Sequence, residues 1–363
     1  MSDKDTINTY KVVMAKEPVR GGYIERYNII NGYIPLLEIN QWLASKSNLR
    51  TAKKYAYMLV SYLNYLDLLE INYREVTKSK IIKGYINYLL FDVLGNVDVL
   101  YQETSRSART VKSYIRRIQR FYKWLEAELE VNGKYREIWD YDYYSEISDS
   151  HQYKKNKEYI KWYTDDEVAI LATNFRTIRD KVIFLITVEG GCRIDEVLTI
   201  KYTDYDGIEG TVYISESKTA QRTVHLPDYV CREIDRYIDT ERRDVETDFG
   251  LLEHLFVNLR RDKSYGNPIT YSNFNRILKN AAARAGFDYR KIKTHSGRST
   301  KAQNLIEHQI IYPEDGVTDA FILETMGWRR MDSIKPYKKE LSNRGKKEVM
   351  GKIELRKRQR NED

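Results

Sequence analysis

Apolar residues recur at helical spacing through the first third of the chain. In residues 48–70 the positions that follow the i, i+3, i+4, i+7 template are Ala52, Tyr55, Ala56, Leu59, Leu63 and Leu66. Residues 78–94 and 105–129 show the same period, whereas residues 1–30 have mixed polarity with a turn signal in EPVRGG. The pattern therefore predicts an N-terminal arm over 1–30 and a helical domain over 31–145.

The helix predicted over 105–129 carries two different stripes. One stripe is apolar and would face a core. The other stripe is basic and consists of Arg109, Lys112, Arg116, Arg120 and Lys123. An ordinary solvated face explains such a stripe without any function. The functional alternative is a helix that lies along DNA phosphates, where each neutralised charge releases counterions.

The pattern changes in the middle of the chain. Residues 131–163 have no clean period and become rich in Lys and Tyr, so we place the domain boundary there and predict a linker over 146–163. The capping-box sequence TDDE at 164–167 then opens a second domain, which we predict to span 164–340.

The second domain has the pattern of a mostly helical unit with one hairpin. A nearly continuous apolar run that stops at Gly190 and Gly191 predicts a buried helix. Residues 211–227 alternate on two arms around a polar turn, which predicts a β-hairpin. Further helices are predicted over 272–285, 296–309 and 318–326. The predicted fold class is mainly α with a small antiparallel β-sheet.

Composition narrows the class of protein. A chain of 363 residues with 42% hydrophobic and 31% charged residues suits two globular domains, and no apolar run approaches the ~18–20 residues of a membrane span. The N-terminus is polar and lacks the apolar core of a secretion signal. The two cysteines, Cys192 and Cys231, have no metal-ligand spacing, which argues against a zinc site or disulfides and favours a reducing, cytoplasmic setting. The net charge of +8 does not by itself establish a polyanionic partner.

Two stretches in the first half of the second domain carry candidate chemistry. In GGCRIDEVLTI, Arg193 follows a Gly-Gly helix stop, and Glu196 lies three residues later on the same helical face. An arginine at a helix start is a reasonable anion site, although an Arg-x-x-Glu pair is most often a surface ion pair. Lys218 lies in the turn of the predicted hairpin, where a long ammonium side chain can reach a ligand but where most lysines are simply solvated.

Two further stretches lie nearer the C-terminus. THSGRS places His295 and Arg298 one helical turn apart, a pairing that suits a phosphate because one group moves protons and the other neutralises charge. Trp328 lies at the end of a predicted helix, and Tyr337 follows nine residues later, after Pro336. Because a proline restricts the residue before it, we predict Tyr337 at the start of a short helical turn or in a mobile segment. Taken alone, a core tryptophan and a packing tyrosine explain this pair.

Taken in order and at these spacings, the stretches resemble the tyrosine recombinase family, which includes phage integrases and tyrosine transposases. The resemblance covers about residues 190–340 in detail. It implies a two-lobed clamp around double-stranded DNA, with residues 31–145 as a helical core-binding domain and residues 164–340 as an α+β catalytic domain. Four protomers would exchange strands on two DNA sites through a Holliday junction.

The resemblance also implies a role for each candidate residue. Tyr337 would attack phosphorus and leave a 3′-phosphotyrosine link and a free 5′-hydroxyl. Lys218 resembles the general acid for the departing 5′ oxygen, and His295 is an acid/base candidate near the nucleophile. Because the covalent link conserves the energy of the broken bond, the reaction needs no ATP, and the resemblance implies neither a metal nor another cofactor.

The charged partners of the reaction follow from the same resemblance. Arg193 and Arg298 would clamp the non-bridging oxygens, where negative charge develops. Trp328, at a position where many members carry His, would donate its indole N–H to one oxygen and support the tyrosine. Glu196 would hold a neighbouring cation or histidine. The Trp in place of His removes one possible proton carrier, and the Ser-Gly pair inside HSGRS replaces a bulkier apolar residue.

Several points stay open at the level of sequence. The segment at 308–320 lengthens the route between the two C-terminal stretches and has no assigned purpose. The basic tail over 341–363 would either contact DNA or dock on a neighbouring protomer. A type IB-like topoisomerase and a non-catalytic DNA-binding regulator are the alternatives to a recombinase. The target sequence, the need for accessory proteins, and the choice between transposition, integration and resolution are not fixed, although the N-terminal arm weakly favours a mobile-element enzyme.

Overall fold

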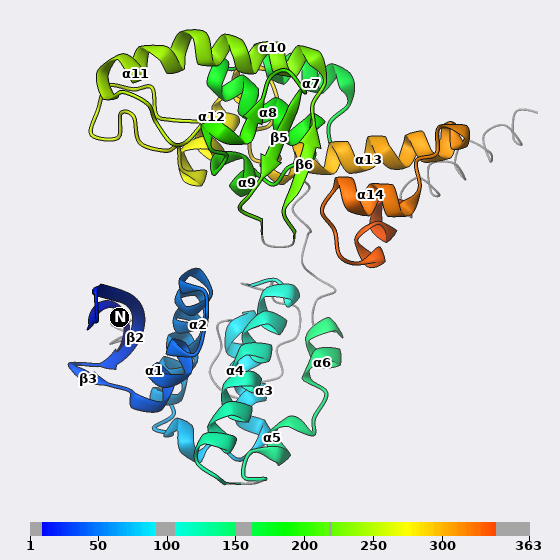
Figure 1. Ribbon diagram of the computed structural model, residues 1–363. Coiled ribbons are helices and arrows are strands. Elements are labelled where there is room, and N and C mark those ends of the chain that lie inside the picture. The colour runs from blue at the N-terminus through cyan, green and yellow to red at the C-terminus, as the bar shows by residue number, and fades with distance from the viewer. Residues whose placement is uncertain (1–8, 92–105, 132, 150–161, 218–219, 339–363) are drawn as a thin grey trace, which may run out of the picture. The chain divides into compact units, whose positions relative to one another are not determined.

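The chain forms two compact units, Met1–Asn156 and Lys157–Asp363, each with its own hydrophobic core. The computed structural model, shown in Figure 1, describes residues 9–91, 106–131, 133–149, 162–217 and 220–338. Helices dominate the described residues of both units, and one small antiparallel sheet is present among those of each unit. The predicted fold class is therefore confirmed, with two small sheets in place of one. None of the helices in the described part of the chain is long and apolar enough to cross a membrane.

The first unit opens with a β-hairpin in the segment that we predict as an arm. Strands β1 (Tyr10–Val19) and β2 (Gly22–Asn31) pair along their whole length, and the short β3 (Ile34–Pro35) extends the sheet. Only the base of the hairpin joins the core, where Ile29 is fully buried. The side chain of Asn40 accepts a hydrogen bond from the Ile29 amide (2.7 Å) and donates one to its carbonyl (3.1 Å).

Six α-helices complete the described part of the first unit. They are α1 (Leu37–Ala44), α2 (Leu49–Asp67), α3 (Ser79–Phe91), α4 (Ala108–Glu128), α5 (Arg136–Trp139) and α6 (Tyr143–Asp149). Their core contains many tyrosines. Tyr62 and Tyr122 are fully buried with their hydroxyls 3.0 Å apart, and Tyr122 donates to the backbone carbonyl of Tyr73 at 2.8 Å. Because these hydroxyls have partners, they can be buried at little cost, and burial raises the pKa of both tyrosines far above the ordinary value.

The second unit is built around α8 (Ile178–Glu189), the buried helix that the apolar run predicts. Helices α7 (Asp165–Thr173), α10 (Asp228–Tyr237), α12 (Tyr271–Arg284) and α13 (His295–Ile311) pack against α8. The predicted capping box at the start of α7 is present, with reciprocal bonds between Thr164 and Glu167.

The sheet of the second unit contains the predicted hairpin. Strand β5 (Thr211–Ile214) pairs antiparallel with β6 (Arg222–His225) on one side and with β4 (Tyr205–Asp206) on the other. The inward alternation is as expected, since Val212 and Val224 face each other in register and are buried. A short helix, α9 (Ile194–Leu198), follows the Gly-Gly stop, and α11 (Arg243–Phe249) continues α10 through a π-helical turn.

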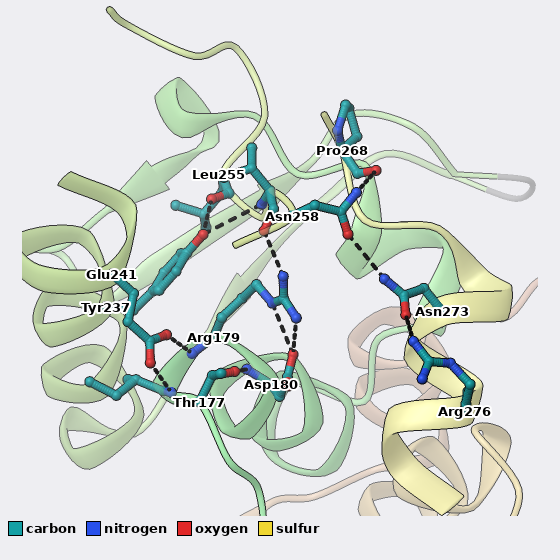
Figure 2. Close-up of polar contacts among 12 residues, drawn as sticks. Thr177, Arg179, Asp180, Tyr237, Glu241, Leu255, Asn258, Pro268, Asn273 and Arg276 are labelled. Carbon is teal, nitrogen blue, oxygen red and sulfur yellow. Dashed lines mark hydrogen bonds and ion pairs between the residues drawn. The ribbon is translucent and has the colours of Figure 1, made fainter. Parts of the chain in front are cut away.

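A buried polar network fixes the loop between α11 and α12 (Figure 2). Arg179 on α8 is neutralised by Asp180 (Nε–Oδ1 2.9 Å) and donates to the carbonyl of Val257 at 2.8 Å. Asn258 donates to the carbonyl of Pro268 at 3.2 Å and accepts from Asn273 on α12 at 3.0 Å. Because these polar groups have partners inside the protein, the loop holds its shape with little regular secondary structure.

The segment at 308–320 contains the last turn of α13, a short loop and the start of α14 (Asp319–Thr325). It contains a 3₁₀ turn, Pro313–Asp315, and Gly316 adopts a left-handed conformation (φ 73°) that leads into α14. His308 pairs with Asp315 at 2.7 Å. The connection thus brings α14, and the Gly-Trp turn behind it, back alongside α13.

Candidate active site

Arg193 occupies the N-cap position of α9 and is separated from the Gly190-Gly191 stop by Cys192 alone. Its backbone amide donates to Glu196 Oε2 at 2.9 Å, and its Nη1 donates to Glu196 Oε1 at 2.7 Å. The predicted Arg-x-x-Glu ion pair is therefore formed, but it is not the exposed ion pair that its residue types alone suggest. Glu196 is only 3% exposed, whereas the Arg193 side chain keeps 25% of its surface open to solvent.

Glu196 also accepts hydrogen bonds from residues of the β5–β6 hairpin. Ser217 Oγ donates to Oε1 at 2.9 Å, and Arg222 Nη2 donates to Oε2 at 2.9 Å. Burial by itself raises the pKa of this carboxyl, but the hydrogen bonds from Arg222 and Arg193 outweigh it and lower the pKa to about 2. Glu196 is therefore ionised at any physiological pH.

Arg298 lies on α13 and is 1% exposed. Its Nη1 donates to the carbonyl of Gly191 at 2.6 Å, its Nη2 donates to the carbonyl of Met326, and its guanidinium lies 5.7 Å from the centre of the Trp328 ring. Burial, followed by the charge of Arg193, lowers its pKa to about 10, which still leaves a cation at neutral pH. Arg298 thus joins Arg193 and Arg222 as the third positive charge beside the Glu196 carboxylate.

The glycine of the Ser-Gly pair, which departs from the family pattern, has a packing reason. A Cβ atom on Gly297 would lie 2.4 Å from Thr187 Oγ1 and 3.1 Å from Thr187 Cβ on α8. Only a glycine allows α13 to approach α8 this closely, and this approach brings Arg298 within hydrogen-bonding distance of the Gly190-Gly191 turn.

Tyr337 lies in a helical turn over 335–338, one of the two outcomes predicted from Pro336. It is 8% exposed, and its ring packs against Trp328 (centroids 5.8 Å apart, stacked) and Trp162 (6.4 Å). Its hydroxyl donates to Ser299 Oγ at 3.3 Å. The nucleophile candidate is therefore fixed by packing against two other aromatic rings.

His295 begins α13 and shares a cavity of about 530 Å³ with Tyr337. The cavity is also lined by Tyr271, Ser299 and Trp328. Burial lowers the pKa of His295 below its ordinary value, and the charges of Arg298 and Arg193 add to this effect. A neutral imidazole at pH 7 can accept a proton.

The structure brings five of the predicted catalytic residues and Glu196 into one part of the second unit. Lys218 lies outside the described residues, although Ser217 and Arg222 on either side of its turn are both bound to Glu196. Arg222 and Ser299 were not among the predicted residues. The position of Arg222 could have been found from the hairpin alternation, because it shares the inward face of β6 with the buried Val224. Ser299 carried no sequence signal.

The basic stripe on α4 in the first unit faces away from its core. Arg109, Arg116, Arg120 and Lys123 are exposed and Lys112 is half-buried. The charge of Arg120 adds to burial in lowering the pKa of Lys46, so cations from two segments of the first unit lie close together. Such an accumulation favours a polyanionic ligand over a randomly solvated face.

Among the described residues, no group of three or more His, Cys, Asp or Glu side chains could hold a metal ion. The described side chains offer a tyrosine hydroxyl and an imidazole on one cavity. Guanidinium groups lie nearby, around the Glu196 carboxylate.

Comparison with known proteins identifies the family of the chain. The phage integrase family matches residues 161–344. Transposase A from transposon Tn554 of Staphylococcus aureus is 21% identical over 296 residues, which cover 76% of this chain and 78% of that protein. Tyrosine recombinase XerA of Thermococcus kodakarensis is 28% identical over 162 residues, 44% of this chain and 51% of that protein.

Solved structures share the fold. The Tn1549 transposon integrase in complex with circular intermediate DNA superposes with a TM-score of 0.60 at 14% identity and covers 83% of this chain and 94% of that one. The XerH site-specific recombinase bound to a palindromic difH substrate superposes with a TM-score of 0.60 at 14% identity, over 84% of this chain and 80% of that one. Since the family match alone spans half of its length, the chain belongs to the phage integrase family and is a tyrosine recombinase.

Proposed function

We propose that this recombinase cleaves DNA with Tyr337 as its nucleophile and with Arg193 and Arg298 as its phosphate clamp. The observation that carries the proposal is that the side chains of Arg193, Arg298 and Tyr337 are linked by shared contacts with Glu196 and Trp328. The arginines both lie beside one buried carboxylate, and Trp328 contacts both the Arg298 guanidinium and the Tyr337 ring. A phosphate held by the arginines would therefore lie near a tyrosine that is already fixed in place.

The proposed reaction is a transesterification. Tyr337 Oη forms a bond to phosphorus, its proton passes to neutral His295, and the bond to the 5′ oxygen breaks. Lys218 would supply the proton that this leaving oxygen takes up. Rejoining is the reverse, with a 5′-hydroxyl of the same or another strand as the attacking group. The number of phosphodiester bonds is conserved, so no external energy source is required.

The larger assembly belongs to the same proposal. Strand exchange between two DNA sites through a Holliday junction requires four active sites, hence a tetramer of this chain. The tail at 341–363, which lies outside the described residues, would dock on a neighbouring protomer or contact DNA. Transposition is the favoured role, because the match to the Tn554 transposase covers 76% of this chain, whereas the match to the XerA recombinase covers 44%. A cytoplasmic location fits this role.

The decisive test is the covalent intermediate. The purified chain is incubated with duplexes that tile the DNA flanking its own gene and that carry a nick next to each candidate cleavage position. We expect an adduct that survives denaturing electrophoresis with wild-type protein and no adduct with Tyr337→Phe. Tyr213→Phe, which changes an exposed tyrosine on β5, is the matched control and should form the adduct normally. An adduct that persists with Tyr337→Phe would show that another residue attacks.

A further inference from the structure

Arg222 is a buried arginine that the proposed reaction does not use. It begins β6, its side chain is 7% exposed, and its Nη2 is shared between Glu196 Oε2 at 2.9 Å and Cys192 Sγ at 3.9 Å. Its other nitrogens, Nε and Nη1, are buried and have no hydrogen-bond partner among the residues that the structure describes. Buried donors without partners are costly, and they call for an explanation beyond packing.

The first consequence of Arg222 concerns the charge of Glu196. Oε1 accepts from the Arg193 and Ser217 side chains, and Oε2 accepts from the Arg193 amide and from Arg222. Arg298 Nη1 lies 3.9 Å from Oε2, too far for a hydrogen bond, and donates to a backbone carbonyl instead. With Arg222 removed, Oε2 would have one strong donor fewer in a buried setting. Among the described residues, Arg298, 3.9 Å away, is a cation placed to replace it.

The second consequence concerns the turn that carries Trp328. Gly327 has a left-handed conformation (φ 56°), and a Cβ atom there would lie 3.0 Å from Arg222 Nη1. The backbone of the turn therefore rests directly on the guanidinium. Trp328, the next residue, stacks on Tyr337. Arg222 thus contacts Glu196 of α9 on one side and supports the Gly-Trp turn on the other.

We propose that Arg222 is a positioning residue for strand cleavage, which keeps Glu196 from drawing Arg298 out of the phosphate clamp and holds Trp328 against Tyr337. It acts through Glu196 and Gly327 and touches none of the proposed reacting atoms. The inference rests on the proposed function, since it assigns a role within the same site. The competing view is that Arg222 only ties the β5–β6 hairpin to the rest of the unit and contributes stability alone.

The experiment measures single-turnover cleavage of a nicked duplex that traps the covalent adduct, with protein in saturating excess. The variants are Arg222→Gln, Arg222→Lys and, as a control, Arg243→Gln, which removes an exposed arginine paired with Asp239. We expect Arg222→Gln to lower the cleavage rate constant by about 10- to 100-fold with DNA affinity within about twofold of wild type. Arg222→Lys should recover part of the rate, and Arg243→Gln should match wild type.

A double-mutant cycle with Glu196→Gln separates positioning from stability. If Arg222 works by neutralising Glu196, the double variant cleaves no more slowly than Arg222→Gln alone, because the charge that draws Arg298 away is gone. Rate reductions that multiply would overturn the proposal. A normal rate constant with a reduced final yield of adduct would also overturn the proposal, because that result indicates partial unfolding. If the Gln variant folds poorly, the Lys variant provides the same test. Absence of any adduct with wild-type protein would overturn the proposed function, whereas a normal rate with Arg222→Gln would overturn only this inference.

Discussion

At the scale of single residues, His295 offers a test by pH. Burial, followed by the charges of Arg298 and Arg193, lowers its pKa below the ordinary value of 6.5. The imidazole is therefore neutral at pH 7 to 8 and becomes protonated only when the pH falls below its lowered pKa. We expect the single-turnover cleavage rate to be level between about pH 7 and 8 and to fall on the acid side of the ordinary histidine pKa.

The variant His295→Gln checks whether this acid limb belongs to His295. Glutamine does not titrate, so its cleavage rate should be lower throughout, by about 10²- to 10⁴-fold for the loss of a general base, and should no longer fall on the acid side. An acid limb of unchanged position in His295→Gln would mean that another group titrates, and His295 would then lose its assigned role.

The same scale shows what a sequence pattern can and cannot supply for this site. The order of Arg193, His295, Arg298 and Tyr337 along the chain was enough to predict that they belong together, and the structure brings them together. The burial of Glu196 was not predictable, because an Arg-x-x-Glu pair looks the same whether it is exposed or inside. Its second partner, Arg222, comes from the hairpin, and only the tertiary packing of the hairpin against α9 brings the two within reach.

At the scale of elements, the contact between α13 and α8 depends on Gly297. A Cβ atom at this position would overlap Thr187 Oγ1 (2.4 Å), and the obstacle is a short side chain in the core that cannot swing away. We expect Gly297→Ala to reduce the free energy of unfolding by about 1–3 kcal/mol, the usual range for overpacking a core, even though alanine has the higher helix propensity. Chemical denaturation measures the change.

A second substitution shows whether the overlap itself is the cause. Thr187→Ala removes Oγ1, so the pair Thr187→Ala/Gly297→Ala should lose less stability than the sum of the two single variants. Additive effects on stability would indicate that Gly297 matters for another reason. Gly286→Ala is a contrast to this site, because a Cβ atom there meets nothing within 4 Å and any loss of stability would come from the left-handed backbone (φ 80°) alone.

Elements differed in how well the sequence predicted them, for a physical reason. The helices of both units have long apolar stripes because a whole face of each is buried, so their period is visible over many residues. In the hairpin of β1 and β2 only the base joins the core, around Ile29 and Val12, and much of the rest is exposed. Because the alternation of buried and exposed residues extends over so few positions, the sequence pattern does not distinguish a strand from an irregular arm.

At the scale of the whole molecule, the division into two units leads us to expect that DNA affinity can be changed without changing the cleavage rate. The α4 stripe belongs to the first unit, whereas the residues proposed for cleavage belong to the second. If the stripe lies along the DNA backbone, each exposed cation neutralises a phosphate and displaces counterions. The variant Arg109→Gln/Arg120→Gln should then weaken duplex binding and reduce the slope of log K against log salt concentration by about 0.9 for each phosphate that is no longer neutralised.

The same variant should cleave at the wild-type rate once the protein saturates the DNA, because the reacting groups are untouched. Arg236→Gln/Arg243→Gln, which removes two exposed arginines of the second unit, is the matched control for the decrease in positive charge, and its salt slope should remain that of wild type. An equal reduction of the slope in both double variants would mean that net charge alone governs binding. An unchanged slope in the α4 variant would mean that the stripe is only a solvated face. Any DNA contacts of the first unit would then come from other residues.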